Sequence, residues 1–377
     1  MKILVITDAS MINVVGGVEK VLTNFANAMI NRGHEVLFAY CFGAKGEFYY
    51  SLNGEVKTYD LLAGNSTMCG GSKVINISIP LKLREFLNNI GANKIKSVVV
   101  ARKKKSYKMV VERLFAKIQP DIIVSSGFFM TDIIKHAESG VGIPVINMCH
   151  SDAKSLLSWM TQQDMKSLSE CSAIQVLMPS DINIFKKIFS KTQIVCIPNM
   201  VPQYVKMDDL QEKTIINVAR IDKNVKRQHL LIKAFGKIVA QFPEWNVELW
   251  GDENGQARYT KELERLINKL HLQQRIKLCG RTHDVLAVYR RASIFAFPSV
   301  FEGFPLAMTE AMSAGLPVVA YRSCPAVNEL VKDGETGLLV DDGVDALAEG
   351  LKRLMENEEL RKQMGGGGTR SDERICA

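Results

Sequence analysis

The feature that most constrains the fold is a strand, loop and helix pattern that occurs twice, roughly 200 residues apart. Residues 2–7 (KILVIT) are a short β-rich run, followed by a glycine-containing loop and a helical pattern that ends at Gly33. Residues 214–218 (TIINV) lead through a polar loop into a second helical pattern at 229–243. Each start therefore opens its own series of alternating strands and helices.

The strands expected in each series are nearly continuous apolar runs. They lie at 35–40, 121–126, 144–149, 173–178 and 192–198, and then at 247–252, 275–280, 294–299, 317–321 and 337–342. Such strands, alternating with amphipathic helices, indicate parallel sheets covered on both faces. We expect two doubly wound, Rossmann-like α/β domains at 1–200 and 214–364, with a linker at 201–213. A ligand would bind in a cleft outside the carboxyl ends of the strands.

Composition excludes several classes of protein. The chain has 377 residues, of which 47% are hydrophobic and 23% charged, as in globular proteins of two domains. No run approaches the ~18 apolar residues of a membrane span, and the first residues are typical of a strand rather than of a signal peptide. The eight cysteines include no CxxC pair, which disfavours a zinc or redox site of that kind. We expect a protein of the reducing cytoplasm.

The positive charge is concentrated in one segment. The net charge of +8 is carried by residues 1–200, and residues 82–117 alone hold 11 basic and two acidic residues. This excess indicates an anionic partner. Apolar residues in the same segment share one helical face: Tyr107, Val110, Val111, Leu114, Phe115 and Ile118. The helix either packs on the core with a solvated basic side or rests on anionic headgroups. We favour peripheral contact with a membrane over nucleic acid, because stacking aromatics are missing beyond Tyr107.

The stretch at 292–320 is the most informative for chemistry. A strand ends near Pro298, a loop follows, and a helix is expected over about 306–313. Glu302 lies in the loop and Glu310 in the helix. Carboxylates accept paired hydrogen bonds from vicinal hydroxyls, so the two can hold a ribose or hexose diol. The alternative is that both lie on a solvated helix face.

Backbone amides in two places can bind a phosphate. Near Glu302, the N–H groups around residues 303–306 (Gly303, Phe304, Pro305 and Leu306) open a helix. Gly16 and Gly17 are adjacent just before the first helix, where the backbone either approaches a phosphate or simply makes a tight turn. Neither first loop contains GxGxxG, which disfavours nicotinamide and flavin cofactors.

The chain resembles a known family across about residues 1–364. EGFPLAMTE at 302–310 resembles the E-x7-E motif of the family 4 retaining glycosyltransferases, which adopt the GT-B fold of two Rossmann-like domains. GGVEKVLTNFANAMINRGHEV, CHSDA, IPNMV, VARIDKNVKRQHLLIKAF and YRRASIFAFPSVFEGFPLAMTEAMSAGLPVV occur in the order that family members show.

The resemblance implies a role for each matching residue. Arg220 and Lys226 correspond to the basic pair that grips the donor diphosphate, and two cations there make a metal unnecessary. Glu302 corresponds to the residue that binds the donor sugar and Glu310 to the one that binds ribose. His150 corresponds to the residue that reaches the transferred sugar; a lone histidine is otherwise more often structural.

Gly16 and Gly17 correspond to the loop over the donor phosphates. No protein nucleophile is implied. The expected reaction is transfer of a sugar, with retention, from a UDP- or GDP-linked donor to a glycan or lipid-linked acceptor in bacterial surface polysaccharide or lipopolysaccharide assembly. No cofactor is expected. A GT-B sugar-nucleotide epimerase and a non-catalytic two-lobed sugar-binding protein are the alternatives.

The end of the chain departs from the family pattern. Members continue into a long closing helix, whereas residues 365–377 read GGGGTRSDERICA. Because glycine is a poor helix former, we expect a disordered tail here.

Overall fold

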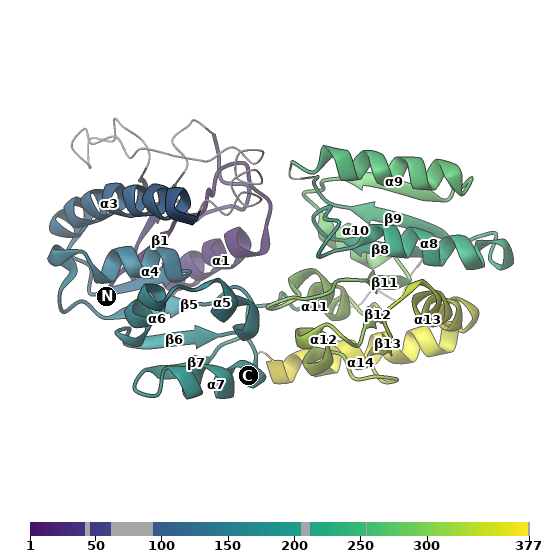
Figure 1. The fold of residues 1–377 in the computed structure, drawn as a ribbon. Helices are drawn as coiled ribbons and strands as arrows, with labels where there is room; N and C mark the ends of the chain where they lie inside the picture. Colours follow the sequence, from purple (N-terminus) through teal and green to yellow (C-terminus); the bar gives the residue numbers. More distant parts are fainter. Residues whose placement is uncertain (42–45, 62–92, 205–211, 254, 376–377) are drawn as a thin grey trace. The chain divides into compact units, whose positions relative to one another are not determined.

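The structure is a computed structural model that describes residues 1–41, 46–61, 93–204, 212–253 and 255–375. The chain divides into two compact units, Met1–Ile197 and Pro198–Ala377, shown in Figure 1. This division lies close to the one expected at residue 200. Within the described residues no helix is both long and apolar enough to span a membrane.

The described part of the first unit contains a seven-stranded parallel sheet in the order β3-β2-β1-β4-β5-β6-β7. Its strands are β1 (Lys2–Thr7), β2 (Glu35–Tyr40), β3 (Lys57–Asp60), β4 (Ile122–Ser126), β5 (Val145–Met148), β6 (Ala173–Val176) and β7 (Gln193–Cys196). All were expected except β3, an edge strand of sequence KTYD in which only Tyr59 is buried. A single buried residue gives no apolar run to detect.

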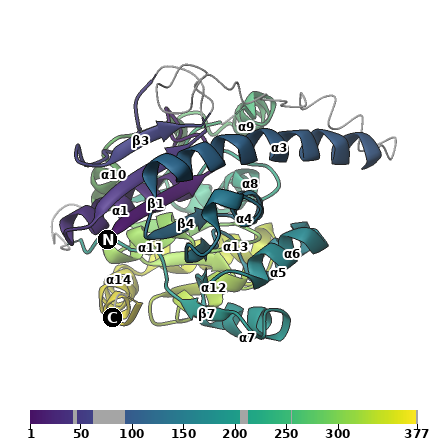
Figure 2. The ribbon, with the colours of Figure 1, turned by 90° about the vertical axis from the view of Figure 1, so that its left-hand side faces the viewer.

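Helices cover both faces of this sheet (Figures 1 and 2). They are α1 (Gly17–Asn31), α3 (Asn93–Ile118), α4 (Phe128–Lys135), α5 (Ala153–Trp159), α6 (Gln162–Ser169) and α7 (Pro179–Ile188), with a 3-10 turn at Glu138–Gly140. Neighbouring residues of β1 enter different cores: Ile3 and Val5 pack with α1, whereas Leu4 and Ile6 pack on the side of α3 and α4. Burial on both faces is why the strand has no polar alternation.

The apolar face of α3 belongs to the core of the first unit. Tyr107, Val110, Val111, Leu114, Phe115 and Ile118 are all at most 5% exposed. The core-facing interpretation of this face is therefore correct, and the face is not available to a lipid surface.

The described part of the second unit repeats the design with a six-stranded parallel sheet in the order β10-β9-β8-β11-β12-β13. Its strands are β8 (Thr214–Val218), β9 (Asn246–Trp250), β10 (Ile276–Gly280), β11 (Ile294–Phe297), β12 (Val318–Tyr321) and β13 (Gly337–Val340). Its helices are α8 (Gln228–Ile238), α9 (Ala257–Lys269), α10 (Val285–Arg291), α11 (Leu306–Ser313), α12 (Pro325–Leu330), α13 (Val344–Glu356) and α14 (Glu358–Ile375), with a 3-10 turn at Val239–Gln241. The expected pair of doubly wound parallel-sheet domains is confirmed.

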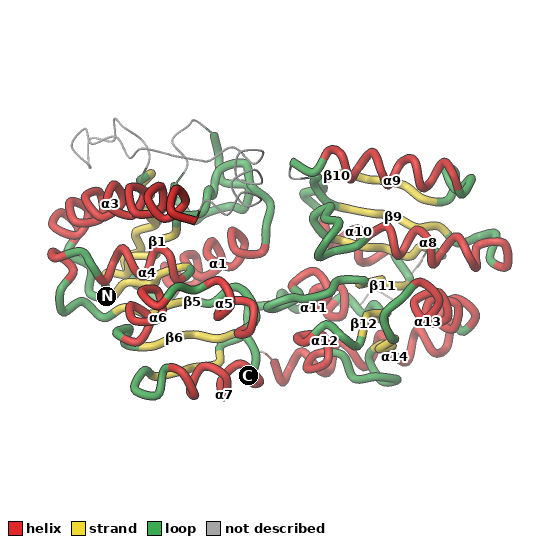
Figure 3. Tube along the Cα trace, viewed as in Figure 1, coloured by secondary structure: helices red, strands yellow, loops and turns green. Residues whose placement is uncertain are grey.

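Residues 365–375, which were expected to begin a disordered tail, belong to a helix in the structure. Helix α14 continues through the four glycines to Ile375, as Figure 3 shows. A Cβ on Gly365 would lie 2.1 Å from the carbonyl oxygen of Gly315, which follows α11. Glycine thus permits a close backbone crossing, and packing beside the fully buried Met364 outweighs the low helix propensity.

Each sheet has one point where the strand order reverses. In the first unit β1 lies between β2 and β4, and in the second β8 lies between β9 and β11. Ligands of doubly wound folds bind at the carboxyl ends of such strands. The loops that follow β8 and β11 are therefore the natural place to look for a site in the second unit.

Candidate functional site

The loops after β8 and β11 are joined by an ion pair. Lys226 Nζ donates to Glu302 Oε1, and the two side chains are only 17% and 13% exposed. The Lys226 ammonium also lies over the ring of Phe297, 5.6 Å from its centroid. The structure thus brings two of the predicted site residues into direct contact at the carboxyl edge of the sheet.

The loop that carries Arg220 and Lys226 is held by polar side chains inside it. The Asp222 carboxylate accepts from the backbone N–H groups of Asn224 (2.9 Å) and Val225 (2.8 Å). Gln228 donates to the Arg220 carbonyl at 2.9 Å and accepts from the Asp222 N–H at 3.2 Å. The Arg220 guanidinium reaches Asp222 at 3.3 Å, yet 46% of its side chain remains exposed. The loop is therefore shaped in advance, and it presents a cation to solvent.

Arg227, the residue that follows Lys226, is held in one conformation. Its backbone is left-handed (φ 50°) at the start of α8. Its side chain donates to the Pro298 carbonyl at 3.0 Å and to Asp342 at 3.3 Å, and lies over the ring of Tyr321. These contacts connect the ends of β11, β12 and β13 to the loop, which limits the positions that Lys226 can take. Sequence reasoning missed Asp222, Arg227 and Gln228, although all lie in the VARIDKNVKRQ motif.

Glu310 lies inside α11 and is only 4% exposed. The phenol of Tyr289, from α10, donates to its Oε2 at 3.2 Å. The two glutamates expected to act together therefore have different surroundings: Glu302 faces a lysine in a loop, and Glu310 faces a tyrosine in the packed interior. The alternative of two glutamates on a solvated helix face is excluded.

More of the backbone groups in the turn before α11 are hydrogen-bonded within the chain than the sequence suggested. The Leu306 N–H donates to the Phe304 carbonyl at 2.9 Å, and the Pro305 carbonyl accepts from Met308 and Thr309 at 3.0 Å each. Phe304 is buried, 7% exposed, and Gly303 adjoins Glu302. Because the Leu306 N–H is already engaged and proline has none, this turn offers fewer donors to a phosphate than the sequence suggested.

In the first unit, Gly16 and Gly17 stand where α1 begins. Gly16 is the N-cap in an extended conformation, and a Cβ there would meet a carboxylate oxygen of Glu19 at 2.2 Å. The acidic side chain folds over the positive end of the helix. A phosphate approaching this turn would have to displace Glu19, so the glycines alone do not define a phosphate site.

His150 follows β5 in the first unit. Its Nε2 lies 2.9 Å from the hydroxyl of Ser126, the last residue of the neighbouring strand β4. Burial lowers the pKa of His150 to about 4, so its imidazole is neutral near neutral pH. Ser126 is a further polar residue at this sheet edge that the motif search did not find.

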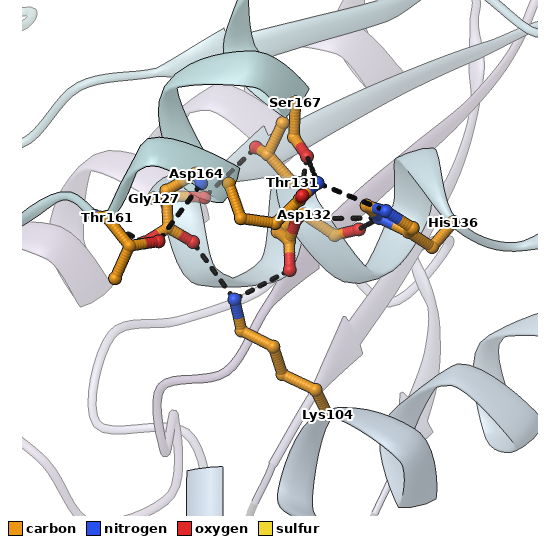
Figure 4. A network of polar contacts seen from close by, with 9 residues as sticks. Lys104, Gly127, Thr131, Asp132, His136, Thr161, Asp164 and Ser167 are labelled. Atoms are coloured by element: carbon orange, nitrogen blue, oxygen red, sulfur yellow. Dashed lines mark hydrogen bonds and ion pairs between the residues drawn. The ribbon is translucent and has the colours of Figure 1, made fainter. Parts of the chain in front are cut away.

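The basic segment contains a structural lysine. Figure 4 shows Lys104 between two buried carboxylates, with its Nζ 2.6 Å from Asp132 and 3.0 Å from Asp164. Lys108 pairs with Glu112 and Glu138. These two lysines balance local acidic residues, so they do not belong to a free anion-binding surface. Residues 82–92 lie outside the described part of the chain.

No group of three or more metal-binding side chains is found among the described residues. The expectation that catalysis needs no metal stays a prediction.

Comparison with known proteins identifies a family match in the second unit and solved structures with the same fold. Residues 206–370, which lie within the second unit, match the family model of glycosyl transferases group 1. Sucrose-phosphate synthase from Thermosynechococcus elongatus superposes with a TM-score of 0.77 at 18% identity, covering 99% of this chain and 94% of that one. HepE from Anabaena, in complex with UDP, gives 0.71 at 19% identity, covering 100% and 96%. The whole chain therefore has the GT-B fold of two Rossmann-like domains.

Sequence similarity to two bacterial relatives covers most of the chain. An uncharacterized glycosyltransferase of Haemophilus influenzae is 25% identical over 356 residues, which cover 93% of this chain and 89% of the relative. The GalNAc-α-(1→4)-GalNAc-α-(1→3)-diNAcBac-PP-undecaprenol α-1,4-N-acetyl-D-galactosaminyltransferase of Campylobacter jejuni is 26% identical over 358 residues, which cover 93% and 88%.

Proposed function

We propose that this chain is a retaining glycosyltransferase of family 4 that moves a sugar from a nucleotide diphosphate sugar to a glycan or lipid-linked acceptor. The observation that carries the proposal is the set of charged side chains at the carboxyl ends of β8 and β11: the loop after β8 carries both the exposed cation of Arg220 and Lys226, and Lys226 is paired with Glu302 of the loop after β11. A diphosphate is bound by positive charge and sugar hydroxyls are bound by a carboxylate, and the Lys226–Glu302 pair brings a cation and a carboxylate together at this edge.

The proposal gives each predicted site residue its own role in the transfer. As the donor bond breaks, negative charge builds on the departing diphosphate, and Arg220 and Lys226 neutralise it in place. Glu302 accepts hydrogen bonds from hydroxyls of the donor sugar, and Glu310 accepts them from the ribose. His150 acts as a neutral hydrogen-bonding group toward the transferred sugar, because burial keeps its pKa low.

Relatives support both substrates. HepE and the S. aureus TarM are solved in complex with UDP, which favours a UDP-linked donor over a GDP-linked one. The Campylobacter jejuni relative acts on an undecaprenol-linked glycan, and the fold neighbour WaaB is a lipopolysaccharide outer core galactosyltransferase. These names favour an acceptor in bacterial polysaccharide or lipopolysaccharide assembly.

The direct test is product analysis. The protein is incubated with UDP- and GDP-sugars, with and without lipid extract, and the products are resolved by mass spectrometry and NMR. A glycosylated acceptor with the donor's anomeric configuration supports the proposal. An isomerised nucleotide sugar indicates an epimerase, and an intact donor that stabilises the fold indicates a binding protein.

The proposed binding of the diphosphate by Arg220 and Lys226 has its own test. Arg220→Ala and Lys226→Ala should each lower kcat/KM by roughly 100-fold or more, the usual scale for losing a preorganised charge contact. Lys223→Ala is the matched control, because Lys223 lies in the same loop but pairs with Glu262 on the surface. We expect it to stay within about threefold of the parent. Equal losses in all three variants would contradict the assignment, as would strict dependence on added metal.

Contact with an anionic membrane is a further part of the proposal, and its test must spare Lys104. Arg102, Lys103 and Lys105 replaced by Ser should weaken binding to vesicles that contain phosphatidylglycerol at physiological salt. The control replaces the exposed Lys186, Lys187 and Lys191, which removes equal charge elsewhere in the first unit. If both triple variants bind as the parent does, the segment is not the contact.

A further inference from the structure

Tyr289 is a fully buried tyrosine whose hydroxyl contacts a candidate substrate-binding carboxylate. It lies in α10, has no exposed surface, and donates to Glu310 Oε2 at 3.2 Å. Its ring packs against Phe295 of β11, with centroids 6.2 Å apart and planes at 62°. The ring therefore has one position, and its hydroxyl is fixed relative to Glu310.

A carboxylate that binds a vicinal diol must present its oxygens in one orientation. The terminal torsion of a glutamate is broad, so packing of the stem alone leaves the carboxylate free to rotate. A hydrogen bond from Tyr289 to Oε2 restricts this rotation. The carboxylate still has acceptor capacity on both oxygens, because each oxygen has two lone pairs.

Helix α11 has a second anchor, which bonds to backbone groups of the preceding segment. Ser313, at the end of the helix, donates to the Pro202 carbonyl at 2.7 Å and accepts from the Tyr204 N–H at 3.1 Å. Ser313 therefore holds the helix, whereas Tyr289 contacts the functional group that the helix carries. Removing one hydroxyl at either position separates the two effects.

We propose that Tyr289 is a positioning residue, which orients the Glu310 carboxylate toward the ribose hydroxyls and so determines the preference for a ribonucleotide. The inference rests on the proposed function, in which Glu310 binds the ribose of the donor. A site built to hydrogen-bond hydroxyls rejects an analogue without them, because its buried acceptor is left unpaired.

The experiment measures a ratio of affinities on each variant. Calorimetry gives the Kd of UDP and of 2′,3′-dideoxyuridine diphosphate for the parent, Tyr289→Phe, Glu310→Gln and Ser313→Ala. We expect the parent to prefer UDP by about 10- to 100-fold, and Tyr289→Phe to reduce this preference by roughly fivefold or more, mainly through weaker binding of UDP. Ser313→Ala should lower the Tm and keep the preference. In the double variant Tyr289→Phe/Glu310→Gln, the preference for UDP should fall no further than it does in Glu310→Gln alone.

The possible outcomes distinguish the positioning role of Tyr289 from the ribose-binding role of Glu310. A parental preference that Tyr289→Phe retains overturns the positioning role and leaves the ribose role of Glu310 in place. A parent with no preference, or an undiminished preference in Glu310→Gln, overturns the ribose assignment and this inference with it. Because both ligands are measured on the same variant, a general loss of stability cannot imitate the expected change of ratio.

Discussion

Neutralising Glu302 should tighten the binding of free nucleotide diphosphate. In the ligand-free protein its carboxylate is paired with Lys226, the cation that the diphosphate needs. A diphosphate that takes up this lysine competes with the carboxylate and is repelled by it. Glu302→Gln keeps the shape of the side chain and a hydrogen-bonding oxygen but removes the charge, so it should remove both penalties.

The size of the effect follows from the burial of the pair. Two unit charges about 6 Å apart interact by about 3 kcal/mol at an effective dielectric constant of about 20. Solvent and salt reduce this, since both side chains retain some exposure. A gain of about 1–2 kcal/mol remains, which is roughly 5- to 30-fold in Kd.

The assay is calorimetry, at low and at physiological salt, with UDP and with the UDP-sugar that the product analysis identifies as the donor. UDP should bind more tightly to Glu302→Gln, with a larger gain at low salt, whereas sugar transfer should fall because the sugar loses its carboxylate. Glu262→Gln is the control, since its partner Lys223 lies in the same loop, outside the proposed grip. Unchanged or weaker UDP binding in Glu302→Gln would refute the competition between carboxylate and diphosphate.

Two further predictions concern stability. Lys104→Met should lower the free energy of unfolding by about 3–5 kcal/mol at pH 7, because it leaves two buried carboxylates without their cation. Burial is the largest single influence on the pKa of Asp132 and raises it, but the hydrogen bonds from Lys104 and Ser167 and the charges of Lys104 and His136 together outweigh burial, so the net pKa is lowered. The stabilisation is therefore present above about pH 4 and lost as pH falls further, so urea unfolding should show parent and variant converging there. Gly366→Ala should stabilise by up to about 1 kcal/mol through helix propensity, whereas Gly365→Ala should destabilise by about 1–3 kcal/mol, because its Cβ meets the Gly315 carbonyl. Thermal melts decide this sign, and stabilisation by both alanines would contradict the tight crossing.

The sequence was informative wherever burial is continuous along the chain. The runs at 214–218 and 294–297 are β8 and β11, in which nearly every position is buried, and the helix expected from about 306 to 313 is α11. β3 escaped notice, because an edge strand with one buried residue leaves no pattern.

Local sequence patterns could not predict contacts between residues that lie far apart in the sequence. Lys104 was counted as part of a charged surface because its partners lie 28 and 60 residues away. Tyr289 was taken as part of a motif without a role, since only the fold brings it to Glu310, 21 residues on. The glycines of α14 were interpreted by propensity alone, and their fit against another backbone is not a local property.

The buried imidazole of His150 has a consequence for enzymology. With a pKa of about 4, the ring is almost entirely neutral between pH 6 and 8 and should produce no inflection in a rate profile over that range. An acid limb near pH 6 would instead report another titrating group, such as the terminal phosphate of a nucleotide diphosphate, whose second ionisation lies close to that value. Replacement of His150 by glutamine should then alter the height of the profile and leave its midpoints where they were.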